Sequence, residues 1–191
     1  MSTAHPERRG ALLVFASATV WSFGGAIARF LEVTDSWIVV FWRSVFAASF
    51  LLGFMLWRSG PRGTWASFRA MGRAGVGVGL CFATASTAFV VALSYTTLAN
   101  VLLMQAGVPL LAALMGFMLF GERVAGNTWL AITVVIAGVA IMVSGSLGGG
   151  ISPLGDGLAL LVALAFASAT VISRRHQEVG MMPAVCLGTL I

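Results

Sequence analysis

Six apolar segments, each long enough to cross a lipid bilayer, constrain the fold of this chain more than any other feature. They lie near residues 10–31, 36–57, 74–94, 98–120, 127–145 and 154–173, and a seventh begins near Met181. A membrane-spanning helix needs about 17–25 predominantly apolar residues. Only 9% of the residues are charged, against about 25% in soluble domains. The sequence therefore predicts an all-α polytopic membrane protein with six spans and the start of a seventh.

The arginines indicate how these segments are oriented in the membrane. The chain has no lysine, and if the N-terminus is cytoplasmic, nine of its eleven arginines fall on the cytoplasmic side. These nine are Arg8, Arg9, Arg58, Arg62, Arg69, Arg73, Arg123, Arg174 and Arg175. Cytoplasmic loops of membrane proteins carry such an excess of basic residues. We therefore predict a multi-pass protein of the cytoplasmic membrane with a cytoplasmic N-terminus.

The same distribution argues against nucleic acid as a partner, although the formal net charge is +5. The arginines form short clusters beside apolar spans, which is typical of membrane flanks rather than of a nucleic-acid-binding surface. The longest connection, from Arg58 to Arg73, also carries Trp65 and Phe68. That composition is typical of a segment at the level of the lipid headgroups.

One six-residue sequence, Phe-Ala-Ser-Ala-Thr-Val, occurs twice. The first copy covers residues 15–20 in the first span, and the second covers residues 166–171 in the sixth span. Because an odd number of spans separates their starts, the two copies run in opposite directions across the membrane. Inverted repeats are common in secondary transporters. Coincidence is the alternative, since Ala, Ser and Thr are frequent in packed membrane helices, but the opposite orientation favours duplication.

Longer stretches resemble the EamA-like branch of the drug/metabolite transporter superfamily. The resemblance is carried by VWSFGGAIAR in the first span, FWRSVFAASFLL in the second, and the run from ALSYTTLANVLLMQAGVPLL to GERVAGNTWLAITVVIAGVAIMV. The sixth span, GDGLALLVALAFASATVISRR, resembles the opening helix of the family's second repeat. The resemblance implies inverted five-helix repeats, with the first over residues 10–145 and the start of a second over 154–191. It also implies that the chain is C-terminally incomplete.

Candidate substrate-binding residues gather in the fourth span. Pro109 lies near its middle, and a proline there removes one backbone hydrogen bond and displaces the carbonyl of Gln105. Irregular backbone at membrane depth is tolerated where it faces protein or a water-filled cavity. We therefore expect Asn100, Gln105 and Pro109 to line a central substrate cavity. The alternative is that the two amide side chains join helices through hydrogen bonds.

Three further residues are candidates for binding, gating or structural roles. Trp21 lies near the middle of the first span, where it would stack on a substrate or fill space between helices. Arg43 lies inside the second span, and because a charge there is costly, we expect a structural pair with Glu32 or Asp35 rather than an anion site. Glu122, at the inner end of the fourth span, is either a gate contact or part of a solvated turn.

The sequence contains no signature of an enzyme or of a metal site. Its two histidines lie in predicted cytoplasmic segments, and neither HExxH nor GxSxG occurs, so an intramembrane enzyme is disfavoured. Cys81 and Cys186 both lie in apolar runs and define neither a disulfide framework nor a zinc site. No acidic residue is embedded at membrane depth in the six predicted spans, and Asp156 lies at the outer edge of the sixth. We predict no cofactor and no metal.

These features together predict a secondary transporter. The resemblance implies small organic metabolites, amino acids or drugs as substrates, moved outward across the cytoplasmic membrane by alternating access. The predicted partners are a small-molecule substrate and the lipid bilayer, and a homodimer is compatible with them. The alternative is a non-transporting membrane adaptor or assembly protein, which is favoured if the chain is naturally this short.

Overall fold

The computed structural model describes residues 10–20, 23, 35–121, 125–145, 152–177 and 180–191, and within these ranges all regular secondary structure is helical. The all-α class predicted from the sequence is confirmed. The chain divides into two compact units, Met1–Thr34 and Asp35–Ile191. The described helix of the first unit is Gly10–Val20. In it the Thr19 hydroxyl donates to the Phe15 carbonyl over 2.9 Å.

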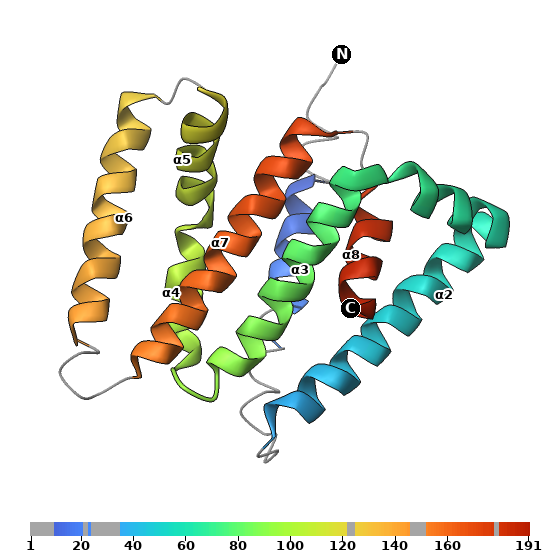
Figure 1. Ribbon diagram of the computed structural model, residues 1–191, viewed down its shortest axis with the longest axis horizontal. Coiled ribbons are helices and arrows are strands. Elements are labelled where there is room, and N and C mark those ends of the chain that lie inside the picture. Colours follow the sequence, from blue (N-terminus) through green and yellow to red (C-terminus); the bar gives the residue numbers. More distant parts are fainter. Residues whose placement is uncertain (1–9, 21–22, 24–34, 122–124, 146–151, 178–179) are drawn as a thin grey trace. The chain divides into compact units, whose positions relative to one another are not determined.

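In the described part of the second unit every regular element is a helix. These helices are α2 (Ser36–Ala70), α3 (Gly72–Ala92), α4 (Leu98–Ala106), α5 (Val108–Phe120), α6 (Gly126–Gly145), α7 (Pro153–Arg175) and α8 (Met181–Leu190) (Figure 1). Among the described residues, α2, α3 and α7 are each long and apolar enough to cross a membrane, and the bent pair α4 and α5 forms a fourth such unit. The apolar stretches Gly10–Val20, Gly126–Ile141 and Met181–Leu190 are shorter.

Helix α2 continues well beyond the predicted end of the second span at residue 57. A kink at Gly60, with φ 66° and ψ 174°, divides it into a long arm and a short arm that ends at Ala70. Glycine adopts this backbone conformation without a Cβ clash, and the following Pro61 is well suited to the first turn of a new helical arm. The connection that we predicted at the headgroups is thus helical, and Trp65 on it is 72% exposed.

The fourth predicted span is broken into two helices. α4 ends at Ala106 and α5 begins at Val108, and their axes differ by 41°. Pro109 lies in the first turn of α5, where its missing N–H is tolerated. Gly107 at the break donates its N–H to the Met104 carbonyl over 3.1 Å. A Cβ on Gly107 would lie 3.1 Å from Val135 of α6, so the break also allows α6 to approach closely.

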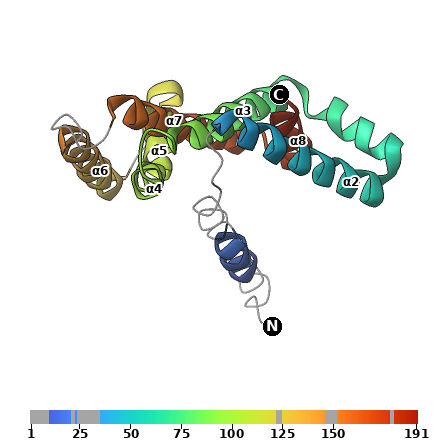
Figure 2. The ribbon, with the colours of Figure 1, turned by 90° about the horizontal axis from the view of Figure 1, so that it is seen from below.

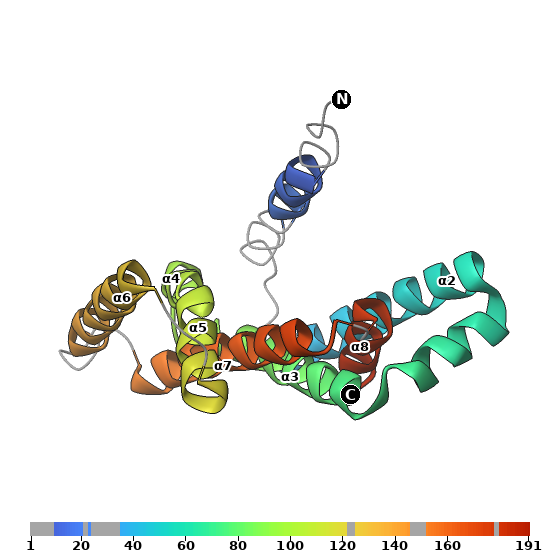
Figure 3. The ribbon, with the colours of Figure 1, turned by 90° about the horizontal axis from the view of Figure 1, so that it is seen from above.

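Helix α7 is the central packing element of the second unit. It lies beside α3 in all three views and also contacts α4 and α5 (Figures 1 and 3). Its buried positions are mostly small, namely Ala159, Val162, Ala163, Ala165, Ala167 and Ala169. Membrane helices associate mainly through close van der Waals packing, which small side chains permit.

Helix α8 packs against α3 and α2 (Figure 2). Two glycines make the contact with α3 close, because a Cβ on Gly188 would lie 2.6 Å from the Gly79 carbonyl oxygen. Gly79 belongs to the glycine-rich start of the third span, and its surroundings agree with a helix-packing role. A Cβ on Gly75 would instead meet the side chain of Met71, from the preceding turn of the chain.

Candidate functional site

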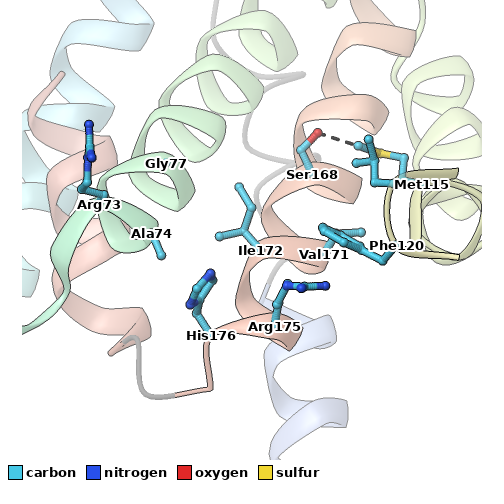
Figure 4. Close-up of a pocket in the computed structure, with 11 residues that line it drawn as sticks. Arg73, Ala74, Gly77, Met115, Phe120, Ser168, Val171, Ile172, Arg175 and His176 are labelled. Carbon is cyan, nitrogen blue, oxygen red and sulfur yellow. Dashed lines mark hydrogen bonds between the residues drawn. The ribbon is translucent and has the colours of Figure 1, made fainter. Parts of the chain in front are cut away.

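A cavity of about 560 Å³ lies between α3, α5 and α7, towards the end of α7 that carries Arg175 (Figure 4). Its walls are mostly apolar and come from all three helices. The apolar lining residues are Ala74, Met115, Leu119, Phe120, Val171 and Ile172. Gly77 of α3 also lines it. The volume falls within the range of about 300–1,000 Å³ that is usual for small-molecule sites.

The polar lining residues are Arg73, Ser168, Arg175 and His176. The Arg175 guanidinium lies 4.1 Å from the centroid of the Phe120 ring, a cation–π contact. Within the described residues Arg175 forms no ion pair, and no carboxylate lines the cavity. Ser168 donates its hydroxyl to the Leu164 carbonyl over 2.8 Å. Figure 4 shows Arg175 and His176 near Ile172 and Val171, whereas the Arg73 guanidinium points away from them.

A buried polar cluster lies at the opposite end of α7. The Asn100 Nδ2 of α4 donates to Asp156 Oδ1 of α7 over 2.5 Å and to Thr96 Oγ1 over 2.8 Å. Asn100 is 5% exposed and Asp156 is 4% exposed. Within the described residues, Asp156 Oδ2 has no hydrogen-bond partner. Asp156 lies in the first turn of α7, at the edge of its span as expected, and the structure adds that it is buried by the helices around it.

Close backbone packing accompanies this polar cluster. A Cβ on Gly155 would lie 2.7 Å from Thr96 Cβ and 2.9 Å from the Tyr95 carbonyl. The start of α7 therefore presses directly on the turn between α3 and α4. In that turn Thr97 caps α4, because its hydroxyl accepts the Asn100 N–H over 3.3 Å. At this end of α7, direct contact with the turn between α3 and α4 thus leaves no opening between these elements.

Of the predicted substrate-binding residues, Asn100, Gln105 and Pro109 lie in the described part of the chain, and none of these three is among the residues that line this cavity. Asn100 is held by Asp156 and Thr96, which is the helix-joining arrangement that the sequence left as an alternative. Gln105 is half-buried, and its Nε2 atom is buried without a hydrogen-bond partner in the described part of the chain. Pro109 is exposed in the first turn of α5. Trp21 and Glu122 lie outside the described residues.

Arg43 joins two helices by a hydrogen bond. Its guanidinium donates to the Ser86 carbonyl of α3 over 3.1 Å. Asp35, one of the two acids expected to pair with it, instead caps α2 by accepting the Trp37 N–H over 2.9 Å. The other expected partner, Glu32, lies outside the described residues. The arginine inside the second span therefore has a backbone carbonyl as its described partner.

Sequence reasoning missed the residues that form the cavity. Ser168 belongs to the second copy of the repeated sequence, and Arg175 belongs to an arginine pair, so both were used as markers of duplication and orientation. Met115 and Phe120 look like ordinary lipid-facing residues in an apolar run. The available signal was the spacing of Ser168 and Arg175, which lie seven residues apart in the sequence and so share one face of a helix.

The described residues contain no metal-binding cluster of three or more His, Cys, Asp or Glu side chains. Cys81 and Cys186 are both free thiols. What the described part of the chain offers for binding is thus an apolar cavity with arginine at one end. That arrangement holds small molecules by packing and charge.

Several apolar helices of spanning length, one of them a broken pair, are typical of a multi-pass membrane protein. The family model of the EamA-like transporter family matches residues 8–144. The chain belongs to this family and is therefore a membrane transporter of the drug/metabolite transporter superfamily. No curated protein and no solved structure matches the chain.

Proposed function

We propose that the protein is a secondary transporter that exports small organic metabolites, amino acids or drugs across the cytoplasmic membrane by alternating access. The proposal is supported mainly by the difference between the two ends of α7. The cavity lies near Arg175, while the Asn100–Asp156 contact and the Gly155 packing close the other end. An alternating-access transporter needs a site that is open to one side of the membrane and closed to the other.

The arginine distribution supports outward transport. It predicts that the C-terminal end of α7, with Arg174 and Arg175, is cytoplasmic. In that orientation the cavity faces the cytoplasm and the closed polar cluster faces outside. An exporter collects its substrate from the cytoplasm, so this conformation corresponds to its loading state.

The inverted repeat remains part of the proposal, with a first repeat over residues 10–145 and the start of a second over 154–191. The matched stretch, residues 8–144, begins two residues before the proposed first repeat and ends before the second. In both copies of the six-residue sequence the threonine donates to the carbonyl four residues earlier, from Thr19 to Phe15 and from Thr170 to Phe166. Threonine in a helix commonly makes this bond, so the sequence identity and opposite orientation carry most of the argument.

Counterflow in liposomes tests the transport proposal. The purified protein is reconstituted, loaded with unlabelled amino acids or organic acids, and supplied with trace labelled compound outside. Uptake above that of empty liposomes supports transport. If a broad panel of amino acids, organic acids and cationic drugs shows no counterflow, the adaptor alternative is favoured.

Labelling from one side tests the orientation. Ser59, which is exposed at the end of the long arm of α2, is replaced by cysteine in a Cys81→Ala and Cys186→Ala background. The proposal expects an impermeant maleimide to label Ser59→Cys in inverted vesicles and not in intact cells. Labelling in intact cells would place this segment outside and contradict the predicted direction.

A further inference from the structure

We propose that the cavity between α3, α5 and α7 binds a water-soluble organic anion with a compact apolar body, such as an aromatic carboxylate. This inference rests on the proposed transport function and specifies the substrate class for it. It assigns Arg175 as the residue that holds the anionic group, and Phe120, Val171 and Ile172 as contacts of the apolar body.

The walls of the cavity define the body of the ligand. Six of its lining side chains are apolar and come from three different helices. A sugar or a polyol would lose hydrogen bonds to water on entering such walls, because few lining groups replace them. An aromatic or branched apolar group instead gains free energy by leaving water. The volume of about 560 Å³ accommodates one or two rings and is too small for a lipid with two acyl chains.

The geometry of Arg175 defines the charge of the ligand. Its guanidinium stacks on the Phe120 ring with 4.1 Å to the centroid, and stacking uses the flat face of a guanidinium. The N–H donors of a guanidinium lie in its plane, so they remain available for a carboxylate or phosphate. The described contact of the Arg175 guanidinium is the one with the Phe120 ring. The Phe120 ring therefore orients the Arg175 guanidinium, and the N–H donors of Arg175 can still bind an anionic ligand.

The remaining polar lining residues favour an anion over a cation. Arg73 of α3 adds a second positive charge at the edge of the lining, with its guanidinium pointing away from Arg175 (Figure 4), and no acidic residue is among the described lining residues. A cationic ligand would meet like charges with no carboxylate to offset them. Because Arg175 is exposed, a neutral ligand would leave its guanidinium in contact with solvent and gain no charge-assisted hydrogen bond from it, whereas a carboxylate gains one.

Binding of 2-naphthoate tests the inference directly. The purified protein in phosphatidylcholine liposomes is titrated with 2-naphthoate, with its neutral isostere 2-naphthamide and with the cation 2-naphthylmethylammonium. We expect the anion to bind on the order of tenfold or more tightly than the amide, as a charged hydrogen-bonded contact implies. Equal affinity for anion and amide would overturn the inference without the need for any variant.

An adjacent pair of arginines supplies the matched variants. Arg175→Gln is expected to lower the affinity for 2-naphthoate to that for 2-naphthamide and to leave the affinity for the amide unchanged. Arg174→Gln removes the same charge one residue earlier, at a position that does not line the cavity, and is expected to bind like the parent protein. If the two variants behave alike, the assignment of Arg175 is wrong.

Two controls separate the possible sources of failure. Liposomes that contain phosphatidylglycerol reveal whether an anionic lipid occupies the cavity, and loss of 2-naphthoate binding in them would overturn the assignment to a soluble ligand.

Counterflow separates the inference about the bound anion from the proposal of transport. If the protein binds 2-naphthoate selectively but shows no counterflow, the transport proposal is contradicted and the anion site is supported. If the protein shows counterflow of neutral or cationic compounds but does not bind 2-naphthoate, the inference about the anion site is wrong and the transport proposal stands.

Discussion

Asn100 of α4 donates to Asp156 of α7 over 2.5 Å, which joins two helix starts that are far apart in the sequence. Both hydrogens of the Asn100 amide are used, because Thr96 Oγ1 accepts the other over 2.8 Å. The contact is buried from solvent. A polar pair inside a membrane protein is costly to break, because neither partner can turn to water instead.

Replacing Asn100 by leucine is expected to destabilise the protein by about 2–3 kcal/mol, because it leaves Asp156 buried without a donor. The combined Asn100→Leu and Asp156→Leu variant should recover part of that loss, since it removes the stranded acid. Chemical unfolding in detergent of Asn100→Leu, Asp156→Leu and the combined variant completes a double-mutant cycle. Asn127→Leu, at an exposed position near the start of α6, is the control. If the effects of the Asn100 and Asp156 replacements are strictly additive, these two residues are not coupled.

Two glycines that flank Asp156 provide a second matched test. A Cβ on Gly155 would clash with Thr96, while a Cβ on Gly157 has nothing within 4 Å. Gly155→Ala is therefore expected to destabilise by about 1–3 kcal/mol through overpacking. Gly157→Ala should be neutral or stabilise by up to about 1 kcal/mol through helix propensity. Thermal unfolding in detergent distinguishes them, and a harmless Gly155→Ala would contradict the close contact at the closed end.

Gln105→Leu separates a binding role from a structural one. The Gln105 Nε2 atom is buried without a partner in the described residues, so an apolar side chain of similar size should leave stability unchanged or slightly raised. If Gln105 contacts substrate, counterflow by the variant should fall several-fold while expression and melting temperature are retained. Unchanged counterflow would remove Gln105 from the site, and a large drop in melting temperature would indicate that its amide has a structural partner.

The helices were largely predictable because hydropathy over some twenty residues depends only on local sequence. The positions of α3, α6 and α7 follow the predicted spans closely. The connection from Arg58 to Arg73 was predicted only as a segment at the lipid headgroups, because its composition does not determine the backbone angles at Gly60. Gly60 adopts φ 66° and Pro61 opens a new helical arm.

The candidate site was much less predictable, because it depends on which helix faces meet. Asn100 and Asp156 are each ordinary polar residues near helix ends, and only the packing of α7 against α4 makes them a buried pair. Phe120 and Arg175 likewise come together from separate helices. A single sequence records the type of each side chain but not its partner across the bundle, so the binding residues were assigned to the kinked span instead.

The alanine-rich face of α7 has a mechanical consequence. Where Ala85 and Ala88 of α3 meet Val162 and Ala165 of α7, the two helices contact each other through short side chains that have few rotamers to change. Beside them the Phe82 ring of α3 packs edge-on against the Phe166 ring of α7, with 5.5 Å between the ring centroids. Motion of α7 along its own axis, a shear, would therefore require little repacking at the alanines but would have to separate these two rings.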